Sequence, residues 1–137
     1  MTSQWQLFCV LLSSALLIMS SAPAAALEDA DPNNPEVQDS AAFALESFNY
    51  FNKDPYLYKI TTFESVKQMA VGGMRYEMDV LVKRSQCKKG EETGMDSCEF
   101  FTSPEDAKVF RCHFVVLNVP WKNQKVLIKS ECTPVQK

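Results

Sequence analysis

The sequence predicts an α+β domain in which one long helix packs across a four- to five-stranded antiparallel sheet. Two patterns support this fold class: one apolar stripe with helical spacing, and several later segments in which apolar and polar residues alternate. The third observation is size, since 137 residues with 46% hydrophobic residues suffice for a single core. We expect this single domain to cover residues 27–137, behind a signal peptide at residues 1–26.

The signal peptide is predicted because the first 26 residues contain no Asp, Glu, Lys or Arg. Their apolar core at residues 7–19 is shorter than the roughly 20 residues that a membrane-spanning helix needs, which disfavours a signal anchor. Small residues follow, and Ala24-x-Ala26 predicts cleavage before Leu27, with Ala22-x-Ala24 as a second option. We therefore expect a secreted, extracellular protein.

The helix is predicted to begin with Asn34 as N-cap, Pro35 at the first position and Glu36 in the first turn. It should end near Asn52, because Asp54-Pro55 cannot continue it. Its apolar stripe consists of Val37, Ala41, Ala44, Leu45, Phe48 and Phe51. On the opposite, solvent-facing side we expect Asp39, Ser40, Glu46 and Asn49.

The sheet is predicted from four later segments rich in β-branched and aromatic residues: 56–69, 74–83, 110–117 and 125–132. In the last segment, Val126, Ile128, Ser130 and Cys132 alternate with Lys125, Leu127, Lys129 and Glu131. Residues 70–73 and 119–123 connect neighbouring strands as hairpins. A polar excursion over residues 85–108 links the two middle strands, and residues 27–33 form a loose acidic arm.

Cysteine spacing predicts two disulfides. The expected cleavage removes Cys9 and leaves an even set, Cys87, Cys98, Cys112 and Cys132, for which three pairings are possible. We expect no metal site and no cofactor, because no C-x2-C occurs and His113 is the only histidine.

Charge and motifs exclude several classes of function. A net charge of −3 disfavours binding to nucleic acid or to an anionic membrane, since both need a basic surface. A catalytic pair of His113 with a cysteine would need a free thiolate, and all four remaining cysteines are expected to be paired. The chain contains no G-x-S-x-G, H-E-x-x-H, P-loop or dinucleotide motif. We therefore expect that the protein is not an enzyme.

The two hairpin tips are the most informative segments. Gln68-Met69-Ala70-Val71-Gly72 is uncharged, and Pro120-Trp121 places the only Trp after the predicted cleavage at the second tip. Such apolar tips are candidates for a contact surface, and the alternative is that they fold back on their own sheet.

These tips resemble two signatures of the cystatins, Q-x-V-x-G in the first hairpin and Pro-Trp in the second. The cysteine spacing resembles the secreted, type 2 branch of that family. The resemblance covers residues 34–132 and implies the cystatin fold, with disulfides Cys87–Cys98 and Cys112–Cys132. It also implies reversible, tight inhibition of papain-like cysteine proteases such as cathepsins, whose cleft is blocked by two hairpin loops. The binding residues would be Gln68, Met69, Ala70, Val71, Gly72, Pro120 and Trp121.

The sequence departs from the family pattern in two places. The Gly that helps the family's N-terminal arm lie in the protease cleft falls near Ala25, and no Gly precedes Gly72 after the predicted cleavage. Some type 2 members inhibit legumain through an Asn, and the matching position here is Lys53, one residue after Asn52. We therefore do not expect legumain as a partner.

Two other functions stay open. One is a secreted module with the cystatin fold that has lost inhibition and binds another protein. The other is a small secreted enzyme, for which the sequence offers no site.

Overall fold

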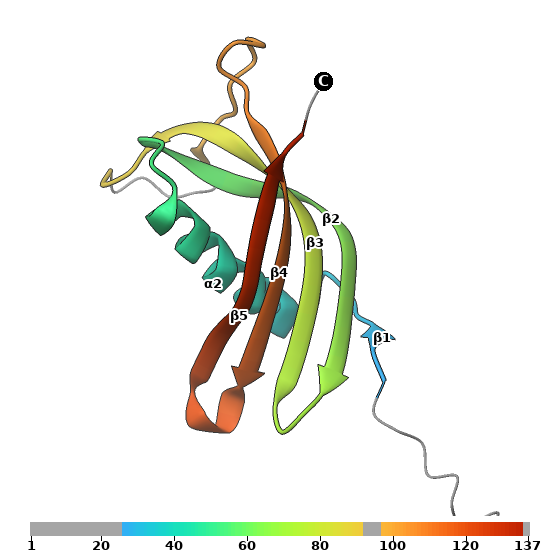
Figure 1. Cartoon of the computed structure of the whole chain (residues 1–137). Helices are drawn as coiled ribbons and strands as arrows, with labels where there is room; N and C mark the ends of the chain where they lie inside the picture. Colours follow the sequence, from blue (N-terminus) through green and yellow to red (C-terminus); the bar gives the residue numbers. More distant parts are fainter. Residues whose placement is uncertain (1–25, 92–96, 136–137) are drawn as a thin grey trace, which may run out of the picture.

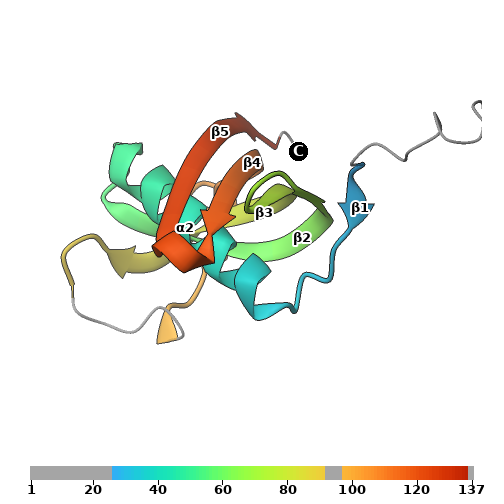
Figure 2. The ribbon, with the colours of Figure 1, turned by 90° about the horizontal axis from the view of Figure 1, so that it is seen from below.

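The computed structural model describes residues 26–91 and 97–135. The predicted signal peptide lies outside these residues, apart from Ala26. Helix α2 lies across a five-stranded antiparallel sheet of order β1-β2-β3-β4-β5, which curves around it (Figures 1 and 2). The elements are β1 (Glu28–Asp29), α2 (Pro35–Phe51), β2 (Tyr56–Ala70), β3 (Met74–Lys88), β4 (Val109–Val119), the 3-10 turn η2 (Pro120–Lys122) and β5 (Gln124–Pro134). The predicted fold class is confirmed.

Helix α2 begins and ends where its capping residues predict. The Asn34 side chain accepts a hydrogen bond from the Glu36 amide at 2.9 Å, and Pro35 opens the first turn. At the other end the Asn52 amide donates to the Phe48 carbonyl at 2.9 Å. Most of the predicted apolar stripe faces the sheet: Val37, Ala41 and Ala44 are fully buried in the core, and Leu45 and Phe48 pack against it. Phe51 was predicted in the same stripe but is 77% exposed in the last turn of the helix. Helical periodicity places a residue on a face, but it does not show where along the helix the packed part of that face ends.

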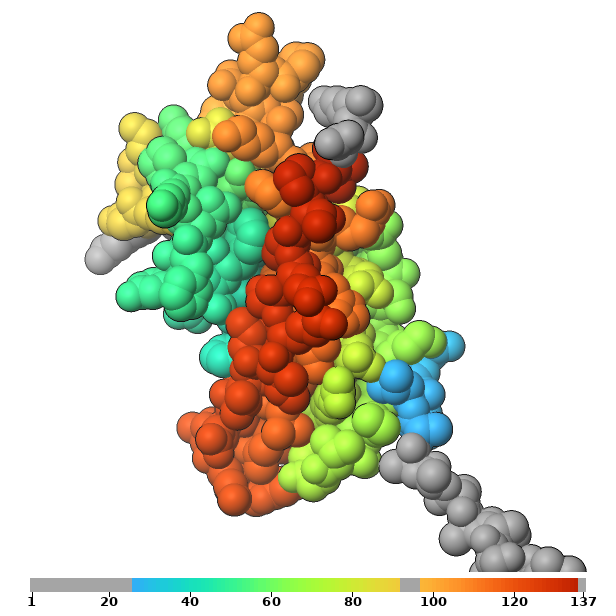
Figure 3. Space-filling model, viewed as in Figure 1, coloured from blue at the N-terminus to red at the C-terminus, as the bar shows by residue number. Residues whose placement is uncertain are grey.

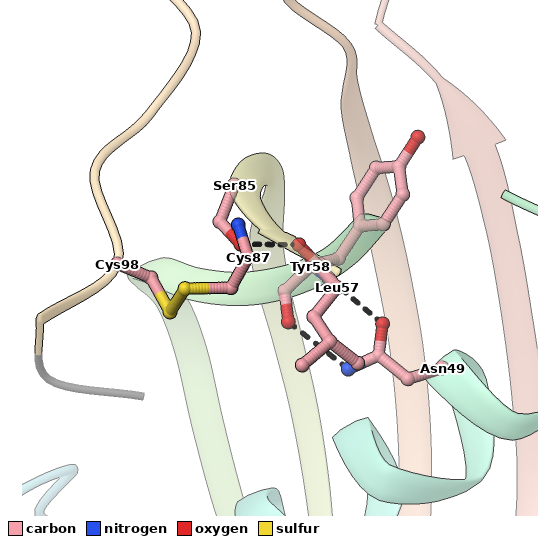
Figure 4. Close-up of a disulfide and its surroundings, with 6 residues drawn as sticks. All are labelled: Asn49, Leu57, Tyr58, Ser85, Cys87 and Cys98. Atoms are coloured by element: carbon pink, nitrogen blue, oxygen red, sulfur yellow. Dashed lines mark hydrogen bonds between the residues drawn. A yellow bond between two sulfur atoms is a disulfide. The ribbon is translucent and has the colours of Figure 1, made fainter. Parts of the chain in front are cut away.

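Two polar residues expected on the solvent side of α2 are buried instead: Ser40 is 0% exposed and Asn49 is 7% exposed. The Asn49 side chain donates to the Tyr58 carbonyl at 3.0 Å and accepts from the Tyr58 amide at 2.8 Å (Figure 4). A side-chain amide offers the same donor and acceptor as a peptide, so it can pair with the first part of β2 without leaving buried groups unsatisfied. Hydrophobic periodicity alone cannot reveal such an exchange.

A buried ion pair fixes the loop between α2 and β2. The guanidinium Nε of Arg84 on β3 lies 2.9 Å from Oδ2 of Asp54, and their side chains are 14% and 8% exposed. The Tyr56 amide and the Tyr58 hydroxyl each donate to Asp54 at 3.0 Å. Burial by itself raises the pKa of Asp54, but these hydrogen bonds and the Arg84 charge outweigh it and hold that pKa below its usual value.

The other end of α2 is held by a second tyrosine–carboxylate contact. The Tyr76 hydroxyl on β3 donates to Glu36 at 2.7 Å, and the Tyr76 side chain is buried. Burial and the neighbouring Glu36 carboxylate raise the pKa of this phenol. Both ends of the helix are therefore tied to the sheet by polar groups.

The arm and strand β3 differ from the sequence prediction. The arm is not loose, because Glu28 and Asp29 form β1 and pair with Gln68 and Lys67 of β2. Strand β3 continues to Lys88, into the predicted polar excursion, where the buried Ser85 hydroxyl donates to the Leu57 carbonyl at 2.7 Å (Figure 4).

Strand β5 does not keep the simple alternation that its sequence suggests. Its register against β4 shifts between Val115 and Val116, so Leu127 packs toward the core, whereas Val126 and Ile128 are exposed. A bulge of this kind exchanges the two faces of a strand, and the pattern on either side of it must be read separately.

Both disulfides have the pairing that the resemblance implied. Cys87 at the end of β3 joins Cys98, with Cα atoms 5.6 Å apart (Figure 4). Cys112 joins Cys132 across β4 and β5, with Cα atoms 4.1 Å apart. The second bridge braces the strands that carry the second hairpin tip.

Replacing Asp54→Asn should destabilise the fold by about 3 kcal/mol near neutral pH, because Arg84 is left buried without its partner. The pKa of Asp54 is lowered from 3.8, so its stabilisation is present at higher pH and is lost as the pH falls through the folded-state pKa. The difference between wild type and variant should therefore shrink below about pH 4. Urea unfolding near pH 7 and near pH 3 measures the free energy of unfolding of both proteins, and hence this difference.

The matched control is Asp39→Asn, because Asp39 pairs with Lys125 at 2.7 Å but is 63% exposed. Its loss should change stability by no more than about 0.5 kcal/mol. An Asp54→Asn effect of equal size at both pH values would contradict the role given to the ionised carboxylate.

Candidate functional site

The first hairpin tip connects β2 to β3 through Val71, Gly72 and Gly73. The Val71 amide donates to the Gly73 carbonyl at 3.0 Å, which closes the turn. Gly72 has a φ of 79°, a left-handed conformation that costs other residues free energy, and no atom lies within 4 Å of the position its Cβ would take. Val71 beside it is 47% exposed. The tip is therefore apolar, well defined and open to a partner.

Gly73 lies where the first tip meets the second hairpin. The sequence predicted it in the connection 70–73 but not among the contact residues. A Cβ at this position would lie 2.8 Å from the Asn118 carbonyl oxygen and 3.1 Å from a Val119 methyl group. Only glycine lets β3 approach the end of β4 so closely. The adjacent glycines Gly72 and Gly73 indicated a tight turn in the sequence. That Gly73 lies against Asn118 and Val119 follows from the tertiary structure alone.

The second hairpin tip is the 3-10 turn η2 between β4 and β5. Asn123 closes it in the left-handed conformation, with φ 48° and ψ 47°, and its amide donates to the Pro120 carbonyl at 3.0 Å. Trp121 is 69% exposed, so its ring does not pack on its own sheet. Figures 1 and 3 show the two tips side by side at one end of the molecule.

The N-terminal arm lies beside the first tip. Strand β1 pairs with β2, the Ala30 amide donates to the Val66 carbonyl at 3.0 Å, and Lys67 lies 2.9 Å from Asp29. Ala26 and Glu28 line a small hollow together with Met69 and Met74 of the first hairpin. Arm, first tip and second tip therefore share one end of the sheet, although the sequence separates them widely.

These three segments carry several of the large apolar side chains that are exposed in the described residues. Leu27 of the arm, Val71 of the first tip and Trp121 of the second are 44%, 47% and 69% exposed. Val126 and Ile128 follow the second tip on β5 and are also exposed. An apolar edge of this kind is typical of a surface that binds another protein.

The structure offers no support for a Cys–His pair in the described residues. Cys112, next to His113, is bonded to Cys132, and His113 Nδ1 lies 2.7 Å from an Asp79 carboxylate oxygen. Within residues 26–91 and 97–135, no group of three or more His, Cys, Asp or Glu residues is arranged to hold a metal ion. No helix in this part of the chain is long and apolar enough to cross a membrane.

Comparison with known proteins identifies the protein family. The family model described as the cystatin domain matches residues 25–121. Over 100 residues the chain is 38% identical to a cystatin of Coturnix japonica, covering 73% of this chain and 85% of that protein. It is 36% identical to human cystatin-SN over 104 residues, which are 76% of this chain and 73% of that protein. The chain belongs to the cystatin family, whose role at family level is inhibition of cysteine proteases.

Solved structures agree on the fold. Dimeric human cystatin F superposes with a TM-score of 0.76 at 24% identity, covering 85% of this chain and 92% of that chain. Mouse fetuin-B in its complex with crayfish astacin superposes with a TM-score of 0.68 at 21% identity, covering 85% and 40%. At these identities the likeness concerns the fold alone.

The first tip departs from the family signature at one position. In Gln68-Met69-Ala70-Val71-Gly72, valine is the fourth residue, whereas Q-x-V-x-G has it third, where this chain has Ala70. The apolar surface at the tip is kept, because Val71 itself is exposed.

Replacing Gly73→Ala should separate the two tips slightly, because its Cβ would lie 2.8 Å from a backbone oxygen. We expect a loss of stability of about 1–3 kcal/mol, as for other overpacked sites. In two-dimensional NMR, the amide signals of residues 117–124 should shift. Gly72→Ala is the matched control, since nothing lies within 4 Å of its Cβ position, and it should leave those signals in place. Unchanged signals in both variants would mean that this contact does not couple the tips.

Proposed function

We propose that the protein, secreted after removal of residues 1–26, is a reversible, tight-binding inhibitor of papain-like cysteine proteases of the cathepsin type. One observation supports this proposal most directly. Three segments with exposed apolar side chains lie together at one end of the sheet: the arm, the Gln68–Gly72 tip and the Pro120-Trp121 tip. The membership in the cystatin family supports the same function.

The inhibitor would block the protease cleft without reacting with it. A papain-like cleft is a slot that flanks a thiolate–imidazolium pair. The seven proposed contact residues, Gln68, Met69, Ala70, Val71, Gly72, Pro120 and Trp121, carry no charge, so they can fill the slot at a small cost in desolvation. A tip that lies across the slot offers no peptide carbonyl to the thiolate in attack geometry.

Tight binding requires that the contact residues lose little freedom on binding. The turn hydrogen bonds at Val71 and Asn123, the contact of Gly73 with β4 and the Cys112–Cys132 bridge all define the tips before a partner arrives. A preformed surface keeps more of its interaction energy as affinity. The pairing of β1 with β2 extends this benefit to the first residues of the arm.

Titration of papain with the secreted, oxidised chain tests the proposal. One-to-one loss of activity, without cleavage of the chain and with recovery on dilution, supports it. No loss of activity at a large excess of chain would favour the alternative, a module with this fold that binds another protein. Turnover of an added substrate by the chain itself would indicate an enzyme.

Replacing Gly72→Trp should weaken inhibition of papain more than tenfold, about 1.4 kcal/mol, because the new side chain projects from the tip toward the protease. The matched control is Gly90→Trp. The φ angle of Gly90 is 85°, close to the 79° of Gly72. No atom lies within 4 Å of the position that a Cβ would take at either residue. Both variants therefore carry a similar backbone cost. Only Gly72 lies at the binding edge, the proposed contact surface formed by the arm, the Gln68–Gly72 tip and the Pro120-Trp121 tip. Equal inhibition constants for the two folded variants would remove the first tip from the site.

Replacing Trp121→Ala should weaken inhibition by about 2 kcal/mol, mostly through faster dissociation of the complex, as expected for an aromatic contact residue. The melting temperature of the Trp121→Ala variant should stay close to that of the wild type, because the Trp121 side chain is 69% exposed. Phe51→Ala is the control, since Phe51 is 77% exposed at the far end of α2. Surface plasmon resonance gives the rates, and a lower melting temperature with unchanged dissociation would show that Trp121 stabilises the fold instead.

A further inference from the structure

A second apolar surface lies at the opposite end of the molecule from the hairpin tips. Tyr50 and Phe51, in the last turn of α2, are 81% and 77% exposed, the highest values among the large apolar side chains of the described residues. Their ring centroids are 5.0 Å apart at an angle of 85°. Figure 1 shows that this end of α2 points away from the tips, so the proposed contact with a protease does not account for these rings.

The same surface is hollowed on both sides of the helix. Beside Tyr50 lies an open hollow of about 460 Å³, whose lining includes Ala42, Leu45 and Leu57. Beside Phe51 lies a second one of about 530 Å³, whose lining includes Phe110 and Leu127. Each is in the size range of sites that take a small ligand, so an aromatic side chain can enter.

We propose that this surface, the helix-end face formed by Tyr50, Phe51 and the two hollows, binds a second copy of the chain. A two-fold dimer uses the same patch on both subunits, so the patch must be complementary to itself. The helix-end face meets this condition in shape, because it carries both the protruding rings and the apolar hollows that receive them.

Charge points to the same partner. The hollow beside Tyr50 is bordered by Glu46 of α2 and by Lys89, whose ammonium group donates to the Asn52 carbonyl. A second copy therefore brings both an acid and a base to this border. The chain's net charge of −3 is small enough that two copies repel each other little.

The expected dimer is weak. At about 150 Å² or more for each aromatic side chain, four rings bury roughly 600 Å², which is less than half of a standard interface of about 1,600 Å². The borders of the hollows add to this area. We therefore expect dissociation constants on the order of 10 to 100 µM. Because the tips lie at the other end, each copy in the dimer keeps its binding edge free.

Sedimentation velocity of the secreted, oxidised chain over about 1–500 µM tests the inference. The wild type should show a reversible monomer–dimer equilibrium. Tyr50→Ser combined with Phe51→Ser removes the rings and should raise the dissociation constant at least tenfold. Ala42→Arg fills the hollow from an exposed helix position and should do the same. Circular dichroism and melting temperature check that both variants are folded.

Trp121→Ser is the matched control, because it removes another highly exposed aromatic side chain from the opposite end. It should leave dimerisation unchanged. The inference is overturned if the wild type stays monomeric throughout, or if Trp121→Ser abolishes the dimer and the helix-end variants do not. A dimer that fails to dissociate on dilution would overturn it too, since a weak surface contact exchanges quickly. None of these outcomes depends on the inhibition of papain.

Discussion

The pair of hydrogen bonds between the Asn49 side chain and the Tyr58 peptide is the constraint on which the rest of the structure depends. It fixes the last turns of α2 over the start of β2, in a place where an unpaired polar group would be costly. The Tyr76–Glu36 hydrogen bond fixes the other end of the helix over β3. With the helix held at both ends, the sheet curves around it and the two hairpins end side by side (Figures 1 and 2).

The proposed protease-binding edge, formed by the arm and the two tips, depends on this arrangement of helix and sheet. The close approach of Gly73 to Asn118 places the first tip against the second, and the Cys112–Cys132 bridge holds the strands behind the second tip together. Strand β1 adds the arm on the other side of the first tip. The proposed inhibition therefore needs little rearrangement, which is the physical condition for tight binding by a small rigid protein.

The exposed apolar side chains divide into two groups that lie far apart. One group, on the arm, the tips and β5, suits a protease cleft, and the other, at the end of α2, suits a second copy of the chain. Separation of the two surfaces means that self-association and inhibition need not compete. The Asp54–Arg84 ion pair joins the loop that follows α2 to strand β3, so it stabilises the region that carries the helix-end face.

The sequence by itself determined the helix limits, the strand segments, the two tips and the fold class, because capping residues, periodicity and turn residues act locally. It misplaced Asn49, since a polar residue that pairs with a buried peptide looks the same in sequence as one that faces water. It also placed Ser40 in solvent, whereas this small side chain is fully buried. It also missed β1 and the bulge in β5, because strand pairing depends on residues distant in the chain. Only the tertiary structure decided that Gly73 must be glycine and that the arm and the tips share one edge. Both follow from contacts that are distant in the sequence: Gly73 lies against Asn118, 45 positions later, and Glu28 and Asp29 pair with residues 40 and 38 positions later.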